Sequence, residues 1–219
     1  MDKNESKNRL QTDQIIQSLR TQYIGKELIY FESTDSTNLQ ASLLGKKGSE
    51  NGTLVITDRQ TQGKGRMGRE WISPAYSNLY FSVLLRPSIV PQTASWIPLV
   101  AGVALAKGIH AYTGLSPRIK WPNDLLINGK KAGGILIELH IEGDRISRLV
   151  LGIGINVNMT RFPEEIAPIA TSLKKELGHP IHREPLLVQL SKRSKKSSKA
   201  FTRPARTKPQ EIGRSFLIR

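Results

Sequence analysis

The segment Gln60–Arg69 combines residue types that can hold a phosphate group. It reads QTQGKGRMGR, with three glycines, two arginines and one lysine, and it directly follows the strand-like run TLVIT. Glycines let backbone N–H groups approach a ligand closely, and such groups bind anions together with cationic side chains. An exposed basic turn has the same composition and is the alternative interpretation. The segment is not a Walker A loop, because it lacks the spacing GxxxxGK[ST].

A second segment, Arg118–Asp124, reads RIKWPND and places Lys120 before a bulky Trp-Pro pair. Pro122 restricts Trp121 to extended geometry, so strand alternation predicts that Lys120 and Trp121 face opposite sides, one of them inward. A lysine beside a reacting phosphate neutralises charge as it develops. The alternative is an ordinary solvated strand lysine. Trp71 follows the glycine-rich segment, where its flat ring could cover a ligand or pack in the core.

Two further segments place polar or small residues beside strand-like runs. Glu32–Asn38, with the sequence ESTDSTN, follows the run LIYF. Its hydroxyl and amide groups can cap a helix or hydrogen-bond to a ligand. Gly152–Asn156, with the sequence GIGIN, ends the last predicted strand with small residues that admit close approach of another group. Each of these two signals is weak when taken alone.

The elements that must position these segments are strands separated by turn residues. Asn128-Gly129 and Glu142-Gly143-Asp144 predict two hairpins, because these residues tolerate positive φ. Trp96–Tyr112 predicts a buried helix, Ala41–Lys46 a lesser one, and the first 27 residues a short amphipathic helix. We therefore expect an α+β fold with a mixed, mostly antiparallel sheet flanked by helices. The predicted strands are Leu28–Phe31, Thr53–Thr57, Leu79–Leu85, Leu125–Ile127, Ala132–Leu139 and Leu149–Ile155.

Composition limits the function classes. The chain has 219 residues and no cysteine, which excludes disulfides, thiol nucleophiles and cysteine-type zinc sites. The four histidines show no metal-ligand spacing, so no metal site is expected. The polar N-terminus lacks a signal core, and no stretch approaches the roughly 18 apolar residues of a membrane span. The expectation is a cytoplasmic protein without a membrane partner.

The net charge of +15 suggests nucleic acid at first sight, but its distribution argues otherwise. Residues 191–219 hold ten Lys/Arg and one Glu, which accounts for +9 and leaves +6 for residues 1–190. This basic tail has only two aromatic residues and no apolar periodicity, and it is expected to be disordered. A nucleic-acid-binding protein remains an alternative, whereas the first 27 residues lack the paired helices of a DNA-reading module.

The tail also has the features of a frameshift product. Codons can be chosen for residues 192–219 so that a one-nucleotide shift reads KEIEEVFQSLYSTGQDEASGNWKKLSNT. That string contains an acidic amphipathic helix and then a WKKLSNT segment. The predicted domains are therefore a lead at 1–27, a catalytic domain at 28–190, and a basic tail at 191–219 produced by a frameshift.

In order and spacing, the motifs resemble the catalytic domain of biotin–protein ligases, which carry STN, a GRGRxGR loop, KWPND, an AGIL strand and GIGIN. The resemblance covers about residues 28–190, and KWPND after a GRGR-type loop is specific to this family. It implies the fold shared with class II aminoacyl-tRNA synthetases. Two departures stand out: Lys64 replaces the usual arginine, and the family's small C-terminal β-barrel has no counterpart in residues 191–219.

The resemblance also implies site roles. Biotin would be bound by Ser36, Thr37, Asn38, Gln60, Lys64, Gly65, Arg66 and Lys120. The nucleotide would be bound by Arg69, Asn123, Gly134 and Asn156. Lys120 and Arg66 would be catalytic, with Lys120 contacting the biotin carboxylate and the α-phosphate.

The implied reaction uses biotin, ATP and Mg²⁺. The biotin carboxylate attacks the α-phosphorus to give biotinyl-5′-adenylate and pyrophosphate, and a lysine amine of a biotin carboxyl carrier protein then displaces AMP. The carrier would belong to acetyl-CoA carboxylase or a related carboxylase, a homodimer is possible within the family, and specific DNA binding is not expected. The alternatives are a truncated member that binds biotin with weak or no activity, and a lipoate–protein ligase with the same fold.

Overall fold

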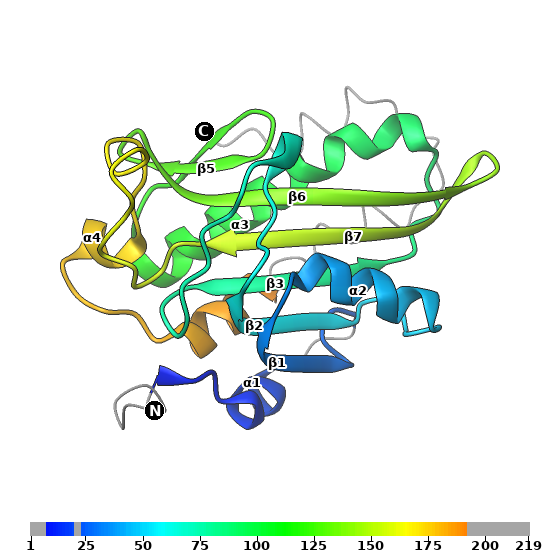
Figure 1. Ribbon diagram of the computed structural model, residues 1–219, viewed down its shortest axis with the longest axis horizontal. Coiled ribbons are helices and arrows are strands. Elements are labelled where there is room, and N and C mark those ends of the chain that lie inside the picture. The colour runs from blue at the N-terminus through cyan, green and yellow to red at the C-terminus, as the bar shows by residue number, and fades with distance from the viewer. Residues whose placement is uncertain (1–7, 20–22, 192–219) are drawn as a thin grey trace.

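The computed structural model describes residues 8–19 and 23–191. Within these residues, seven strands form one sheet in the order β1-β2-β3-β7-β6-β5-β4, in which only β1 and β2 are parallel (Figure 1). The expected mixed, mostly antiparallel α+β fold is confirmed. The strands are β1 (Leu28–Thr34), β2 (Leu54–Gln60), β3 (Leu79–Leu85), β4 (Arg118–Lys120), β5 (Asp124–Ile127), β6 (Lys130–Glu142) and β7 (Arg145–Ile155).

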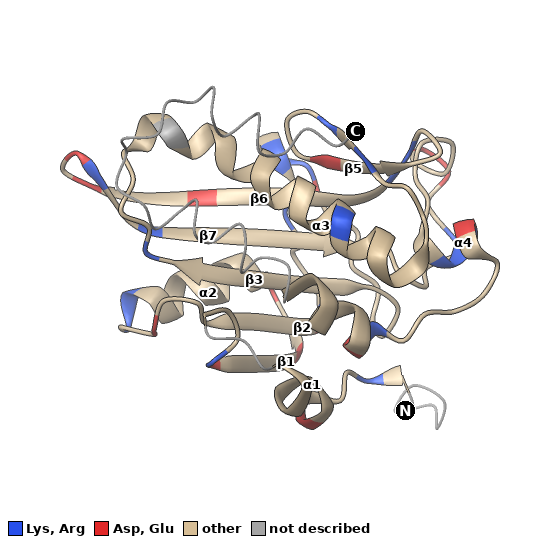
Figure 2. Cartoon of the chain, turned by 180° about the vertical axis from the view of Figure 1, so that it is seen from behind, with Lys and Arg blue, Asp and Glu red and all other residues tan. Residues whose placement is uncertain are grey.

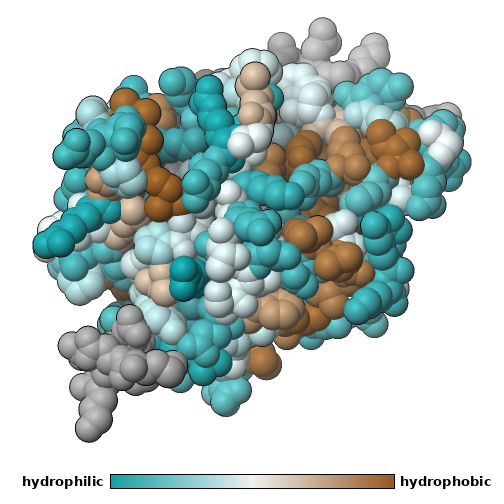
Figure 3. All heavy atoms as spheres, viewed as in Figure 1, coloured by the Kyte–Doolittle hydropathy of each residue, from teal (hydrophilic) through white to brown (hydrophobic). Residues whose placement is uncertain are grey.

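Helices cover both faces of the sheet. The helices and 3-10 turns are α1 (Thr12–Ser18), α2 (Thr37–Lys46), η2 (Arg66–Gly68), η3 (Pro91–Trp96), α3 (Ile97–Thr113) and α4 (Leu173–Leu177), and residues 183–191 are also helical. Helix α2 lies on one face, toward the viewer in Figure 1, and α3 lies on the other, toward the viewer in Figure 2. The apolar side chains left exposed on α2 include Leu39 and Leu43, and brown side chains gather over this helix in Figure 3.

The central strand β3 explains why the core forms where it does. All seven of its residues are buried, and it pairs with β2 on one side and β7 on the other. On the α3 face, Leu79, Phe81 and Val83 join the main apolar cluster; on the α2 face, Leu84 packs in a smaller one with Val55 and Val150. Two-sided burial accounts for the nearly continuous apolar run in its sequence.

Both predicted hairpins are present. Asn128 and Gly129 have φ of 48° and 78° between β5 and β6, and Gly143 has φ of 62° between β6 and β7. Several boundaries differ from prediction, since β1 and β2 continue to Thr34 and Gln60, and α2 starts at Thr37 rather than Ala41. The tertiary partners of these ends extend them, which local sequence patterns do not record.

The expectation that no stretch is long and apolar enough to span a membrane was wrong. The run Ala94–Thr113 is long and apolar enough to pass the length and composition test for a membrane span. Half of its most apolar 18-residue stretch is buried inside the molecule, because α3 packs against the sheet as a core helix. Gly114 ends α3 in the left-handed conformation, with φ of 75°. The predicted frameshift tail from residue 192 onward lies outside the described residues and stays a prediction.

Candidate functional site

A cavity of about 480 Å³ opens on the α2 face of the sheet, beneath the chain that follows β2. In Figure 1 this cyan chain crosses in front of β6 and β7 before it returns to β3. The structure brings all of the sequence-predicted site residues to this cavity, although they come from five separate segments; their individual roles stay predictions. They are Ser36, Thr37, Asn38, Gln60, Lys64, Gly65, Arg66, Arg69, Lys120, Asn123, Gly134 and Asn156.

One end of the cavity is a wall of hydroxyl and amide groups. The Gln60 Oε1 atom accepts hydrogen bonds from the Thr37 backbone N–H at 2.9 Å and from the Thr37 hydroxyl at 3.1 Å. The Gln60 Nε2 atom donates to the Ser73 hydroxyl at 3.0 Å, which in turn donates to the Trp71 carbonyl at 2.8 Å. Ser36 is the N-cap of α2 but makes no side-chain cap bond, so Gln60 satisfies this helix end instead.

Three glycines form the floor beneath this wall. A Cβ on Gly152 would lie 2.1 Å from Asn38 Oδ1, and one on Gly154 would lie 2.5 Å from the Trp71 indole. Gly134, which pairs with Gly154, faces the same indole, and its Cβ would lie 3.1 Å from that ring. We expected Gly152 and Gly154 to admit close approach of another group. The groups that approach are Asn38 and Trp71 of the same chain, so Trp71 forms part of the cavity wall.

The glycine-rich loop folds over the cavity as a narrow turn. Lys64 and Glu70 form an isolated antiparallel bridge, and the Gly65 N–H donates to the Arg69 carbonyl at 2.6 Å. Met67 sits in the left-handed region with φ of 57°, and it is 90% exposed at the tip. The cationic side chains of Lys64, Arg66 and Arg69 are exposed and line the cavity mouth.

The predicted alternation of Lys120 and Trp121 was wrong. Strand β4 ends at Lys120, and Trp121 begins the turn to β5. Both side chains are exposed. Trp121 is 76% exposed, yet both residues line the cavity. The following Asn123 donates to the Ile135 carbonyl at 3.0 Å, and its Oδ1 accepts from Arg66 at 3.5 Å, which links this turn to the glycine-rich loop.

Sequence reasoning missed several lining residues. Lys131 pairs with Asp124 at 2.7 Å and lies over the Trp71 ring, with its Nζ atom 5.4 Å from the ring centroid. Asp124 belongs to the RIKWPND segment and Lys131 adjoins the AGIL strand, so proximity to these motifs was an available signal. Apolar residues of the segment after β7 had no comparable signal: Met159, Phe162, Ile166 and Ile169.

Charge around the cavity is strongly biased toward cations. Within residues 8–19 and 23–191, none of Lys64, Arg66, Arg69 and Lys120 has a carboxylate within ion-pair distance, whereas Lys131 is paired. Two buried donors of the cavity wall, Asn38 Nδ2 and Trp71 Nε1, have no hydrogen-bond partner in the part of the chain that the structure describes. Exposed cations at the mouth and unsatisfied donors in the wall suit an anionic ligand with polar acceptor groups.

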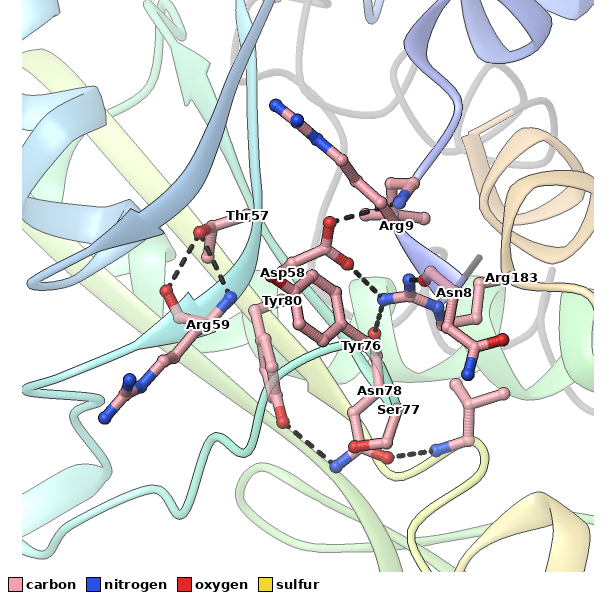
Figure 4. A network of polar contacts seen from close by, with 12 residues as sticks. Asn8, Arg9, Thr57, Asp58, Arg59, Tyr76, Ser77, Asn78, Tyr80 and Arg183 are labelled. Atoms are coloured by element: carbon pink, nitrogen blue, oxygen red, sulfur yellow. Dashed lines mark hydrogen bonds and ion pairs between the residues drawn. The ribbon is translucent and has the colours of Figure 1, made fainter. Parts of the chain in front are cut away.

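Outside the cavity, Asp58 and Arg183 form a buried ion pair, with 2.7 Å between Asp58 Oδ1 and Arg183 Nη1 (Figure 4). Arg183 also donates to the carbonyls of Asn78 and Asn8, and Asp58 accepts from the Leu10 N–H and the Tyr30 hydroxyl. Burial, and then the hydrogen bond to Asp58, raises the pKa of Tyr30 above its ordinary range. This network joins the N-terminal segment, β2 and the last described helix.

An acidic group also lies beside the start of α2. Burial alone would raise the pKa of Asp35, but hydrogen bonds from the Gln40 amide, the Ser36 N–H and the Thr34 hydroxyl outweigh it and lower the pKa. Asp35 therefore stays ionised and orders the turn that delivers Ser36, Thr37 and Asn38 to the cavity.

Comparison with known proteins matches residues 30–156 to the biotin/lipoate A/B protein ligase family. The chain is 43% identical to the bifunctional ligase/repressor BirA of Bacillus subtilis, over 80% of this chain and 54% of that protein. It is 37% identical to the biotin–[acetyl-CoA-carboxylase] ligase of Mycobacterium tuberculosis, over 71% of this chain and 60% of that protein. It therefore spans only about half to three-fifths of these relatives' length.

Among solved structures, the biotin protein ligase from Aquifex aeolicus in complex with biotin and ATP superposes with a TM-score of 0.70. It is 36% identical, and the match covers 81% of this chain and 72% of that one.

Proposed function

The chain belongs to the biotin/lipoate A/B protein ligase family, and on that premise we propose that it activates biotin with ATP and transfers it to a lysine of a carrier protein. The observation that carries the proposal is the composition of one cavity, which is lined both by a wall of hydroxyl and amide groups and by four cations that have no carboxylate partner among the described residues. Biotin has the matching polarity, with a ureido ring at one end and a carboxylate at the other.

The polar wall favours biotin over lipoate as the substrate. A ureido ring offers two N–H donors and one carbonyl acceptor, and Ser36, Thr37, Asn38 and Gln60 supply hydroxyl and amide partners for them. Of their buried polar atoms, Asn38 Nδ2 has no acceptor among the described residues, so a ring without polar atoms would leave it unsatisfied. The dithiolane ring of lipoate has no comparable donors or acceptors.

In the first step, the biotin carboxylate oxygen forms a bond to the α-phosphorus of ATP, and the bond to the β-phosphate oxygen breaks to release pyrophosphate. Lys120 would lie beside the α-phosphate and offset the negative charge that develops there. Arg66 and Arg69, on the loop above, would bind phosphate oxygens, for which the guanidinium fork is suited. Lys64 would contribute charge without that fork. Mg²⁺ would accompany the ATP phosphates.

In the second step, a neutral lysine amine of the carrier attacks the acyl carbon of biotinyl-5′-adenylate. The amide C–N bond forms, the acyl–oxygen bond breaks, AMP leaves, and the amine loses one proton. The mixed anhydride is prone to hydrolysis, so a loop that closes over it would protect it from water. We propose the biotin carboxyl carrier protein of acetyl-CoA carboxylase or a related carboxylase as the acceptor, in the cytoplasm.

The deciding experiment is ATP-dependent labelling of a carrier domain by this chain, with biotin and lipoate supplied separately and then in competition. Biotin-dependent labelling that excess lipoate does not suppress is expected. Labelling with lipoate alone would replace the proposal with its sister activity. Biotin binding and pyrophosphate release without labelling would identify a chain that completes only the first step.

A further inference from the structure

Ser82 is a buried hydroxyl in the middle of the most apolar strand of the sheet. It lies at the centre of β3, is 0% exposed, and has Val55 of β2 and Gly152 of β7 as its strand neighbours. A buried hydroxyl destabilises a core unless it is hydrogen-bonded, and an apolar residue would fit the strand equally well. The position therefore points to a task for this hydroxyl beyond packing.

The partners of Ser82 are two residues of the cavity wall. Its Oγ atom lies 2.8 Å from Thr37 Oγ1 and 2.7 Å from Asn38 Oδ1. An amide oxygen can only accept a hydrogen bond, so the contact with Asn38 requires the proton of Ser82. With that proton on Asn38, the Thr37 hydroxyl shares its own single proton between Ser82 Oγ at 2.8 Å and Gln60 Oε1 at 3.1 Å. Ser82 thus stands behind the wall and holds the orientation of the two side chains in front of it.

Gly152, on the neighbouring strand β7, provides the space in which the Asn38 amide lies. It is the residue paired with Ser82, and a Cβ at its position would lie 2.1 Å from Asn38 Oδ1 and 2.8 Å from Asn38 Cγ. The Asn38 amide therefore fills the space that a side chain at position 152 would take. With its oxygen directed to Ser82, the amide leaves Nδ2 buried and without an acceptor among the described residues.

We propose that Ser82 and Gly152 are positioning residues that hold the Asn38 amide so that its nitrogen serves the carbonyl oxygen of the ureido ring. The inference rests on the proposed function and deepens it by naming what sets specificity at this end of the site. An amide free to rotate would offer its oxygen as readily as its nitrogen. The amide orientation that Ser82 and Gly152 hold therefore selects a ring carbonyl over a ring group that donates hydrogen bonds.

The test compares binding of biotin with that of 2-iminobiotin, in which the ring carbonyl is replaced by a hydrogen-bond-donating imino group. Calorimetry on the wild-type chain should show strong preference for biotin. Ser82→Ala should reduce the ratio of the two dissociation constants by about tenfold, the equivalent of one hydrogen bond. Preference for biotin over its alcohol analogue, which is altered only at the carboxylate end, should stay unchanged.

Thr53→Val is the matched control. Thr53 is also 0% exposed and its hydroxyl donates to Glu27 at 2.6 Å, but it does not line the cavity. It should lower the midpoint of thermal unfolding and leave the biotin to 2-iminobiotin ratio unchanged. Ser82→Cys, which keeps the shape with a weaker donor, should give an intermediate ratio and replaces Ser82→Ala if that variant does not fold.

A folded Ser82→Ala chain with the wild-type ratio would overturn the inference, as would equal loss of affinity for both ligands. Both outcomes leave the proposed function standing, because biotin would still bind the wild-type chain. A wild-type chain that binds neither ligand would overturn the proposed function itself, together with this inference.

Discussion

The ligand cavity and the Asp58–Arg183 network are both polar, but they satisfy their polar groups in opposite ways. Arg183 and Asp58 are 4% and 0% exposed in their side chains, and each has its charge matched by the other and by neighbouring backbone groups. Lys64, Arg66, Arg69 and Lys120 are exposed and have no carboxylate partner among the described residues. The Asn38 Nδ2 and Trp71 Nε1 atoms are buried donors without acceptors in that same part of the chain.

The contrast separates stability from binding. A buried charge without a partner would cost several kcal/mol, so the network must be complete in the folded chain by itself. An exposed cation stays hydrated at little cost and remains available to a ligand. We therefore expect substitutions in the network to act mainly on folding free energy and those in the cavity mouth mainly on catalysis.

The largest effect on stability is expected for Arg183→Leu, which leaves the Asp58 carboxylate buried without its partner. The free energy of unfolding should fall by about 3–5 kcal/mol, measured by urea denaturation. Arg145→Leu, in a pair whose side chains are 86% and 94% exposed, should change it by less than about 0.5 kcal/mol. Arg183→Lys keeps the charge and serves if the first variant does not fold. Equal effects of the buried and exposed substitutions would break the contrast.

Lys120→Ala should show the reverse pattern. Removing the cation beside the α-phosphate should slow adenylate formation about 10²–10³-fold, while the unfolding free energy stays within about 0.5 kcal/mol of wild type. Biotin-dependent pyrophosphate exchange measures the rate. Lys130→Ala, at the exposed first residue of β6, which does not line the cavity, should leave it unchanged. Near wild-type exchange by a folded Lys120→Ala chain would remove this residue from the mechanism.

Gly154→Ala tests the floor of the cavity, where one substitution is expected to affect both stability and ligand binding. The new methyl group would enter the Trp71 indole, and such overpacking costs about 1–3 kcal/mol. We expect lower stability, altered tryptophan fluorescence and weaker ligand binding together. Gly102→Ala in α3 is the control, because its methyl would meet Ile119 at 3.5 Å, an ordinary contact distance. Unchanged fluorescence in Gly154→Ala would contradict this placement of Trp71.

The glycine-rich loop should become protected when its cations are neutralised. Lys64, Arg66 and Arg69 repel one another until an anion binds, so tryptic cleavage at Lys64 and Arg66 should slow about tenfold or more with saturating biotin and ATP. Cleavage at Arg145, in the distant β6–β7 hairpin, is the internal control and should not change. The hypothesis fails if the loop is cut equally fast with and without ligands.

The smallest expected effect concerns Asp35. Because its pKa is lowered in the folded chain, its contribution to stability is present above the unfolded value of 3.8 and is lost as pH falls through the folded value. Asp35→Asn should therefore reduce stability at pH 7, and the difference from wild type should shrink under acid conditions. Asp144→Asn, at a side chain 94% exposed, should show no such trend. A difference that grows in acid would reverse the assigned direction.

Local sequence was enough for the two hairpins and the motifs. Positive φ at Asn128, Gly129 and Gly143 is a property of the residues themselves, so their turns could be predicted without knowing the rest of the fold. The two-sided burial of β3 was equally visible in its apolar run. The resemblance of the ordered motifs to biotin–protein ligases predicted that twelve site residues, spread between positions 36 and 156, would share one site. All twelve line the cavity.

The three-dimensional fold decided which residues from distant segments contact one another. Ser82 and Asn38 lie 44 positions apart, and Gly152 lies 70 positions beyond Ser82. The sequence around each of them does not predict that Ser82 and Gly152 contact the Asn38 amide. The inward placement expected near Lys120 failed for the same reason, because the strand ends where its partners end. Strand period and residue type are local quantities, whereas packing across a sheet depends on register between distant segments, which only the folded chain establishes.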